Sequence, residues 1–227
     1  MYKELFDLES QNEMTSFFLD NLSKLGTNRL YKKGEEINPD HADEVYIVIK
    51  GSLKEVLYST DGDEICFFRL PKGTISGEMD YFDGYRTCVI TKAIQNSIVS
   101  AVHRSILEKE LEKNPKIYRY FIHSITRKYR LLMLKITDDK FNDSIGKVAS
   151  TLLRFAALQE GEPKNNTRIK YQYTYTHEEL AKYLGCSRST ITNVLKNFKE
   201  NNLIDVQNRR VIIKDVDGLK KYTKSIW

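Results

Sequence analysis

One stretch limits what this 227-residue chain can fold into more than any other: HEELAKYLGCSRSTITNVLKNF, residues 177–198. Thr176, just before it, and Glu179 have the spacing of a capping box, which begins a helix. Gly185 can adopt the left-handed backbone that ends a helix, and Ser187 can cap the next one. The stretch therefore predicts two short helices joined by a tight turn, which is a helix-turn-helix.

The second of these helices is predicted to be amphipathic. Its apolar residues recur at the spacing of a buried helix face and are Ile191, Val194, Leu195 and Phe198. Its opposite face carries short polar or cationic side chains, which are Arg188, Ser189, Thr192, Asn193 and Lys196. Such side chains in the first turns of a helix suit the base edges of a DNA major groove. A helical pair in a purely structural bundle is the alternative.

The residues around this helix favour DNA binding. LIDVQNRRVIIK, residues 203–214, predicts two short strands joined by a basic turn, which is typical of the wing of a winged helix. Residues 140–227 carry 16 Lys and Arg against 9 Asp and Glu, whereas residues 1–139 carry 20 against 22. A basic C-terminal third suits a polyanionic partner. The predicted DNA-binding set therefore adds four residues to the helix face: Thr176, Ser187, Arg209 and Arg210.

The region from about Ile37 to Val102 predicts an all-β unit. It contains short β-branched or alternating runs, which are EVYIVIKG, SLKEVLYS, EICFFRL, TCVITKAI and SIVSAV. Turn residues separate these runs, and seven of the eleven glycines lie between Gly26 and Gly84. A chain with so many tight corners between strands favours a jelly-roll or a barrel.

A long helix is predicted from about Pro115, because proline is tolerated in a first helical turn. Its apolar residues step alternately by four and three, which is a heptad seam, and are Tyr118, Ile122, Ile125, Tyr129, Leu132 and Ile136. Charged residues occupy other faces, so we interpret the seam as the interface of a parallel homodimer. The alternative is a helix packed on its own domain. Asp138-Asp139 interrupts the pattern and predicts a hinge before a further helix, SIGKVASTLLRFAALQ.

These segments predict an α+β fold in three parts. Residues 1–114 form the all-β unit, which is double-stranded and jelly-roll-like; residues 115–137 form the dimerisation helix; and residues 138–227 form a winged helix-turn-helix domain. Hydrophobic residues make up 41% of the chain and charged residues 30%, which is typical of a globular protein.

Composition argues against a membrane or secreted protein. No apolar run approaches the roughly 18 residues that a membrane span needs, and the N-terminus is no signal peptide. Cys66, Cys88 and Cys186 lie far apart without a C-x-x-C pair, which favours a cytoplasmic protein without disulfides. We expect Cys88 to be a small buried residue, with a redox role as the alternative.

Over nearly its whole length the chain resembles the Crp/Fnr family of bacterial transcription regulators. IVIKGSLKE is similar to the family's first β-roll hairpin, SGEMDYFDGYRT to its phosphate-binding cassette, and THEELAKYLGCSRSTITNVLKNFKENNLIDV to its helix-turn-helix. The resemblance implies a homodimer that binds palindromic double-stranded promoter DNA, an effector site in the β-roll, and RNA polymerase as a partner.

The cassette carries the implied effector site. Members that bind cyclic nucleotides use Gly-Glu for the ribose and Arg-Ser/Thr for the phosphate. The residues of matching type here are Gly77, Glu78, Arg86 and Thr87. An arginine can pair bidentately with a phosphate, and a glutamate can accept from a ribose hydroxyl. In the alternative, Arg86 bridges to Glu78 and the cassette only holds the fold.

Two departures from the family argue against cyclic AMP as the effector. Leu132 and Met133 are apolar residues at the place where members that sense cyclic AMP contact adenine with polar residues. The segment from Glu78 to Arg86 is also one or two residues shorter than in nucleotide-binding members. We therefore expect a small anionic effector other than a cyclic nucleotide.

The reading helix also departs from the family pattern. Ser189 and Asn193 stand where well-known members have a glutamate and an arginine that read bases. Since asparagine pairs bidentately with adenine, the operator is expected to shift towards A·T.

Two other functions stay open. One is a regulatory adaptor whose winged helix binds protein. The other is a cupin-like metalloenzyme, for which the β region has only His41 and His103, so neither an enzyme nor a metal site is expected.

Overall fold

The structure is a computed structural model that describes residues 5–37, 43–159, 169–170, 175–207 and 210–224. It divides the chain into two compact units. One is Glu9–Tyr129, and the other is Arg130–Trp227 together with Met1–Leu8. The predicted limits of the three domains, at residues 114 and 137, stay a prediction.

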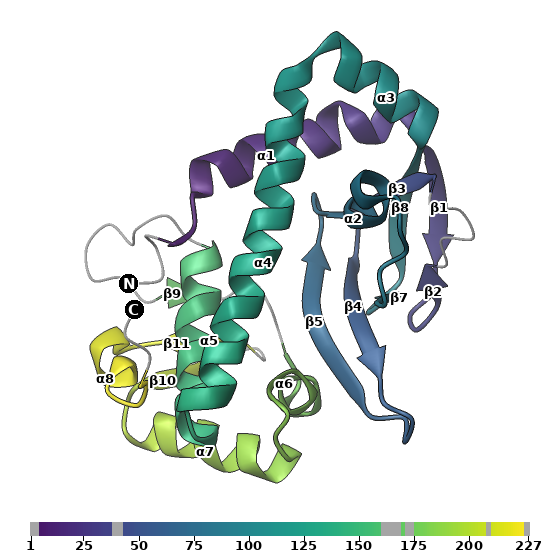
Figure 1. The fold of residues 1–227 in the computed structure, drawn as a ribbon. Coiled ribbons are helices and arrows are strands. Elements are labelled where there is room, and N and C mark those ends of the chain that lie inside the picture. The colour runs from purple at the N-terminus through teal and green to yellow at the C-terminus, as the bar shows by residue number, and fades with distance from the viewer. Residues whose placement is uncertain (1–4, 38–42, 160–168, 171–174, 208–209, 225–227) are drawn as a thin grey trace. The chain divides into compact units, whose positions relative to one another are not determined.

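Two four-stranded antiparallel sheets form a β-roll in the first unit (Figure 1). In spatial order the first sheet contains β1 (Thr27–Tyr31), β8 (Ser97–His103), β3 (Glu44–Lys50) and β6 (Ile75–Ser76). The second contains β2 (Glu36–Ile37), β7 (Ile90–Ala93), β4 (Ser52–Tyr58) and β5 (Glu64–Pro71). The predicted β-roll is confirmed, although β1 lies before the predicted start of the β region at Ile37.

Strand β3 shows how the sequence builds this core. Its four residues from Val45 to Val48 are all buried, so both faces of the strand lie inside the unit, as a continuous apolar run predicts. Gly51 then turns the chain into β4 with a φ of 89°. A Cβ at Gly51 would lie 2.3 Å from the hydroxyl oxygen of Ser97, so this corner requires glycine.

Helices pack on the first sheet and complete the core of this unit. They are α1 (Leu8–Asp20), η2 (Leu22–Leu25), α2 (Glu78–Asp83), α3 (Arg104–Lys113), η3 (Pro115–Ile117) and the first turns of α4 (Tyr118–Phe141). Phe18, Tyr81 and Phe121 come from three of these helices and join Ile47 of β3 in one buried cluster. The long helix predicted from about Pro115 is confirmed as η3 and α4, whereas α1 and α2 were not predicted.

Helix α4 has two unlike faces. Phe121, Ser124 and Lys128 are buried. Most residues of the predicted heptad seam are exposed instead, with exposed fractions of 61% for Ile122 and 63% for Tyr129. The helix also continues to Phe141, so the interruption predicted at Asp138-Asp139 was wrong. Asp138 is buried in an ion pair and does not break the helix.

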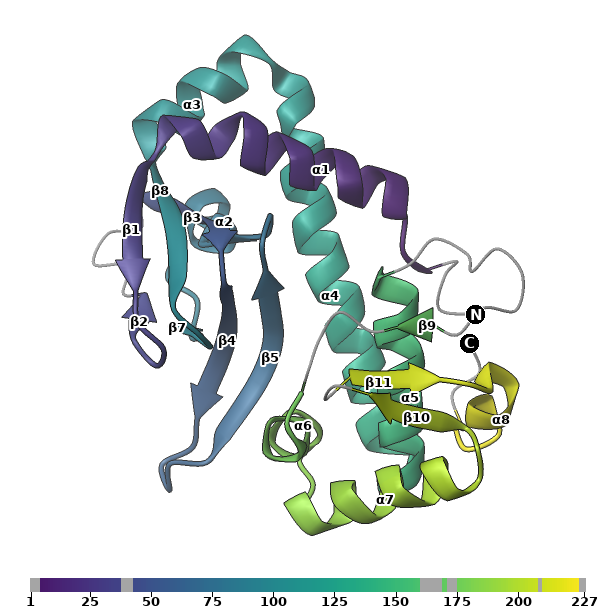
Figure 2. The same ribbon diagram turned by 180° about the vertical axis from the view of Figure 1, so that it is seen from behind.

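The second unit contains a winged helix-turn-helix, as predicted. Its elements are α5 (Ser144–Gln159), β9 (Ile169–Lys170), α6 (His177–Leu184), α7 (Arg188–Glu200), β10 (Ile204–Gln207), β11 (Arg210–Ile213) and α8 (Val216–Lys220). The strands form an antiparallel sheet in the order β10-β11-β9, and Figure 2 shows the β10–β11 pair in yellow. Strand β9 and helix α8 were not predicted. In the described part of the chain, no helix is long and apolar enough to cross a membrane.

A buried ion pair joins α4 to α5 within this unit. The exposed fraction of Arg154 is 1% and that of Asp138 is 3%. Their closest nitrogen and oxygen atoms are 2.9 Å apart. Asn142 also donates to Asp138 over 2.8 Å, and Arg154 donates to the Thr151 hydroxyl over 3.0 Å. The polar residue that seemed to interrupt the apolar pattern of α4 therefore neutralises a buried arginine.

Removal of this carboxylate should destabilise the second unit. Asp138→Ala leaves the Arg154 guanidinium buried without its counterion, which costs about 3–5 kcal/mol of unfolding free energy. Asp139→Ala is the matched control, because Asp139 is half-exposed and its pair with Lys147 is worth at most about 1 kcal/mol. Urea unfolding followed by circular dichroism measures both variants, and equal losses would contradict the role given to Asp138.

Candidate DNA-binding surface and effector cavity

The turn between α6 and α7 has the geometry that its sequence predicts. The Thr176 hydroxyl accepts from the Glu179 N–H over 3.1 Å, and the Glu179 carboxylate accepts from the Thr176 N–H over 2.8 Å. Gly185 ends α6 in the left-handed region with a φ of 63°. The Ser187 hydroxyl accepts from the Thr190 N–H over 3.0 Å and caps α7. The capping box, the turn glycine and the second cap are all confirmed.

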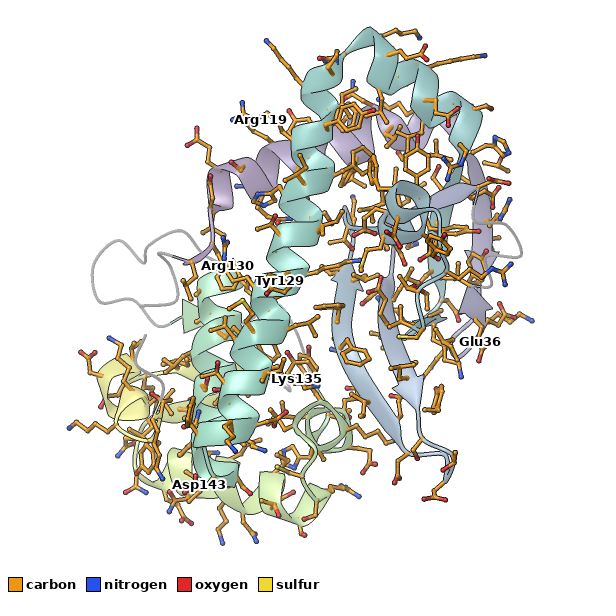
Figure 3. All side chains as sticks on the ribbon, viewed as in Figure 1. Glu36, Arg119, Tyr129, Arg130, Lys135 and Asp143 are labelled. Atoms are coloured by element: carbon orange, nitrogen blue, oxygen red, sulfur yellow. The ribbon has the colours of Figure 1, made fainter. Side chains whose placement is uncertain are left out.

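The inward faces of both helices are buried, that of α7 as predicted. They contribute Leu180, Ala181 and Leu184 from α6, and Ile191, Val194, Leu195 and Phe198 from α7. Tyr183 of α6 is also buried and packs with Phe155 and Tyr175 in an aromatic cluster. The Lys135 ammonium lies 4.8 Å from the centre of the Tyr183 ring, and Figure 3 labels Lys135 on α4. This packing fixes the outward face of α7.

The outward face of α7 is exposed along its whole predicted length. Arg188, Ser189, Thr192, Asn193 and Lys196 are all exposed. Their cations pair only weakly, since Lys196 lies 3.8 Å from Glu200 at the solvent-exposed surface. The predicted wing residue Arg209 and the side chain of Arg210 lie outside the described residues.

Hydrogen bonds already engage some hydroxyl groups of this face. The Thr192 hydroxyl donates to the Arg188 carbonyl over 2.9 Å and lies 2.8 Å from Nδ1 of His177. The Ser189 hydroxyl lies 2.8 Å from that of Ser187. The Thr192 hydroxyl is therefore engaged within the helix-turn-helix. His177, at the start of α6, was not predicted as a site residue, because its contact with Thr192 depends on how the two helices cross.

The β-roll unit contains a cavity of about 160 Å³. Residues of β2, β3, β4, β6, β7, α2 and α4 line it, together with the segment that carries Arg86 and Thr87. Figure 3 labels Glu36, one of the two lining residues on β2. Gly77 precedes α2 with a φ of 84°, and a Cβ there would lie 3.0 Å from the Glu44 carbonyl oxygen. Glycine at this position lets Glu78 begin α2 at the cavity wall.

Three buried charged groups meet at this cavity. The Lys128 ammonium lies 2.9 Å from Oε1 of Glu55 and 2.9 Å from Oε1 of Glu78. Ser76 donates to the same Glu55 oxygen over 3.0 Å. Ser124 donates to Glu78 Oε1 over 3.1 Å. The structure thus pairs Glu78 with Lys128 of α4 and not with Arg86, so the predicted alternative of an Arg86–Glu78 bridge was wrong.

Burial and charge shift the protonation of this cluster. Burial raises the pKa of Glu78, the Lys128 ammonium opposes that rise, and the neighbouring Glu55 carboxylate adds to it. Burial by itself lowers the pKa of Lys128, but the two carboxylates outweigh it, so the net shift is upward. Among the described residues, Glu78 Oε2 is buried and has no hydrogen-bond partner. Lys128 therefore stays protonated, while Glu78 is the group whose ionised form is disfavoured by burial.

The sequence of the chain is similar to those of known proteins. Residues 146–222 match the model of the Crp-like helix-turn-helix domain. The cAMP-activated global transcriptional regulator CRP of Pasteurella multocida is 24% identical over 175 residues, which are 77% of this chain and 82% of that protein. The CRP-like cAMP-activated global transcriptional regulator of Mycobacterium tuberculosis is 28% identical over 180 residues, 79% of either chain. Residues 146–222 therefore form a Crp-like helix-turn-helix domain, and over three quarters of its length the chain is similar to CRP regulators.

A solved structure has the same fold. FixK2 from Bradyrhizobium japonicum aligns with a TM-score of 0.72 at 18% identity, over 89% of this chain and 99% of that one. The α+β architecture of β-roll, long helix and winged helix-turn-helix is thereby confirmed. The chain is a Crp/Fnr-type transcription regulator with a helix-turn-helix domain.

The structure brings together the four cassette residues that the Crp/Fnr resemblance pointed to. Gly77, Glu78, Arg86 and Thr87 all line the cavity. Sequence reasoning missed Glu55 and Lys128. The only signal for Glu55 was a charged residue within a predicted strand, and the only signal for Lys128 was a charged residue beside the seam of the long helix. Leu132 and Met133 belong to the other unit, and their assignment to the effector site stays a prediction.

Cys88 corrects one expectation. It is exposed, so the expectation of a small buried residue was wrong. The residue lies before β7 and not within it, so the apolar run around it does not place it in the core.

Within the residues that the structure describes, no group of His, Cys, Asp and Glu side chains could hold a metal ion.

The raised pKa of Glu78 predicts a pH-dependent stability. An acid whose pKa is higher in the folded state stabilises the fold below its ordinary pKa, about 4.3 for glutamate, and that stabilisation is lost as pH rises through the folded pKa. A tenfold difference in the proton affinity of Glu78 between the folded and unfolded states corresponds to about 1.4 kcal/mol of unfolding free energy. Glu78→Gln should therefore gain stability relative to the wild type as pH rises from about 4 to about 8.

Thermal unfolding across this pH range measures the difference. Glu108→Gln is the matched control, because Glu108 is a half-exposed glutamate of α3 that pairs with Arg104 over 3.6 Å, away from the cavity. The control should follow the wild-type profile. Parallel profiles for wild type and Glu78→Gln would show that Glu78 carries no burial penalty.

Proposed function

We propose that this regulator acts as a cytoplasmic homodimer on palindromic double-stranded DNA, with RNA polymerase as its partner at promoters. An effector in the β-roll cavity sets its activity. The observation that carries the proposal is the outward face of α7. Polar and cationic side chains gather there, exposed, on a helix whose other face is locked into a helix-turn-helix.

The contacts of α7 support separate roles for its residues, some at the bases and others at the phosphates of the DNA. Arg188 and Asn193 are exposed in the first two turns, where an arginine pairs with guanine and an asparagine with adenine. Thr192 engages its hydroxyl internally, so it offers a methyl group that suits the methyl group of thymine. Lys196, with Arg209 and Arg210 of the wing, is assigned to the phosphates.

The exposed seam of α4 supports the dimer. Tyr118, Ile122, Tyr129 and Ile136 are large apolar or aromatic side chains with exposed fractions between 43% and 67%. Ile125 and Leu132, the remaining seam residues, are half-buried. An apolar stripe of this kind on a helix is stabilised when a second helix covers it. Its exposure counts against the alternative that the helix buries this stripe on its own domain.

The cavity supports an effector other than cyclic AMP. The names of the two bacterial relatives describe them as cAMP-activated. In this chain, however, Lys128 and Ser124 hold the glutamate that would accept from a ribose hydroxyl, and Glu55 adds a buried carboxylate to the wall. The cavity of about 160 Å³ is also smaller than the roughly 300–1,000 Å³ of pockets for drug-sized ligands.

Charges placed in the seam should separate the dimer. Ile122→Lys combined with Ile136→Lys puts like charges opposite each other across the two-fold axis, and burial makes that repulsion costly. Sedimentation should show monomers that have lost operator binding. Thr126→Lys is the matched control, because Thr126 is exposed on α4 outside the seam. A dimer that survives the double change would place the interface elsewhere.

Substitutions on α7 should separate base reading from phosphate binding. On an operator selected from random DNA, Asn193→Ala should cost about 1–3 kcal/mol and relax the choice at one base pair per half-site. Lys196→Ala should weaken all sequences about equally and reduce the salt slope by about one. Single-base operator variants measured at two salt concentrations test both expectations.

The same measurements can reject the proposed function. If Asn193→Ala weakened every operator variant equally, the residue would not read a base. If the wild type bound no DNA with a salt-dependent affinity, the winged helix would bind protein, as in the adaptor alternative. Half-site centres of the selected operator should lie about one helical turn, roughly 34 Å, apart.

A further inference from the structure

The cavity wall contains a carboxylate oxygen that lacks a donor. Glu78 has an exposed fraction of 0%, and both of its donors, Lys128 and Ser124, reach Oε1. Oε2 is buried and has no hydrogen-bond partner among the described residues. A buried acceptor left unpaired costs free energy that a ligand with a donor would recover.

The charges beside this oxygen do not balance. Glu55 and Glu78 are two buried carboxylates that share the single buried ammonium of Lys128, which leaves one net negative charge when both are ionised. The other acidic groups of the lining already have partners. Glu36 pairs with Lys92 over 2.9 Å, and the Asp80 carboxylate accepts from the Thr87 N–H over 2.8 Å. Arg86, the other cation of the lining, is exposed and is not part of this buried cluster, so the excess negative charge lies at the Glu55–Glu78 end of the cavity.

The remaining walls are mixed. Ile37, Met79, Val89 and Ile90 line the same cavity beside polar residues such as Thr91. A volume of about 160 Å³ resembles that of an engineered cavity, about 150 Å³, that binds benzene, so it admits a compact body of a few carbon atoms. The cavity therefore combines an acidic end with a small chamber that has an apolar part.

We propose that this cavity binds a small organic ammonium compound, whose N–H groups donate to Glu78 Oε2 and whose short apolar body fills the chamber. The ligand is then a cation, and not the anion that Arg86 and Thr87 by themselves predict. Because the site lies in the proposed sensor unit, the compound is the effector if the proposed function holds, but its binding does not depend on DNA.

Thermal unfolding of the full-length protein without DNA tests this assignment. The probes are n-butylammonium, butyrate, 1-butanol and tetramethylammonium, at equal concentration and ionic strength. A ligand that binds only the folded state raises the unfolding temperature as its concentration rises. We expect that rise with n-butylammonium alone, since butyrate has the wrong charge, 1-butanol has none, and tetramethylammonium has no N–H to donate.

Variants assign the effect to the cavity. Glu78→Gln replaces the acceptor by an amide of the same shape and should weaken n-butylammonium binding at least about tenfold in calorimetry, the loss expected for a charged hydrogen bond. Glu108→Gln, the half-exposed control on α3, should bind as the wild type does. If Glu78→Gln does not fold, Glu55→Gln removes the neighbouring charge and should weaken binding in the same direction.

Three results would overturn the inference: a larger rise with butyrate than with n-butylammonium, equal binding by wild type and Glu78→Gln, or no rise with n-butylammonium at all. Operator binding is measured separately. A protein that binds its operator but no ammonium compound rejects this inference alone. A protein that binds the ammonium compound but no DNA rejects the proposed function alone.

Discussion

The pairing of Lys128 with Glu55 and Glu78 is the interaction on which the β-roll unit depends. It joins α4 to β4 and to α2, three elements that the chain reaches far apart in sequence. A buried charge is tolerated only when it is paired and hydrogen-bonded, so the three groups must stay together. Removal of Lys128 would leave two carboxylates without compensation in the interior.

This constraint also sets the orientation of α4. Since Lys128 is buried in the β-roll unit with Ser124 and Phe121, the seam residues Ile122 and Tyr129, about 100° further around the helix, are exposed. The buried face of α4 therefore mixes polar and apolar side chains, while the seam is an exposed apolar stripe. Such a stripe suits a second helix better than solvent.

The same cluster connects the cavity to the seam through one helix. Lys128 lines the cavity, and the next residue, Tyr129, is among the most exposed residues of the seam. A ligand that changes the hydrogen bonds of Glu78 acts on Lys128 directly. The fold thus places the proposed sensor and the proposed dimer interface on adjacent residues of α4. In the winged helix, by contrast, the outward face of α7 is set by apolar packing and by short-range caps.

The features that the sequence by itself determined are local. The capping box at Thr176, the turn at Gly185 and the strand β3 depend on residues within a few positions of one another, so spacing and residue type were enough to predict them. The seam of α4 follows from a heptad period in the same way, and the family resemblance rests on the same short motifs. None of these predictions requires knowledge of which segments meet in space.

Only the tertiary structure decided the contacts between distant segments. Glu55 is a charged residue in a strand, yet it is buried, because Lys128, 73 positions later, neutralises it. Asp138 seemed to interrupt a helix, yet it pairs with Arg154 of the next helix. In both cases the residue is charged, and residue type by itself indicates exposure. A charge is buried only when a partner comes to it, and the partner is chosen by how the chain folds back and not by local pattern.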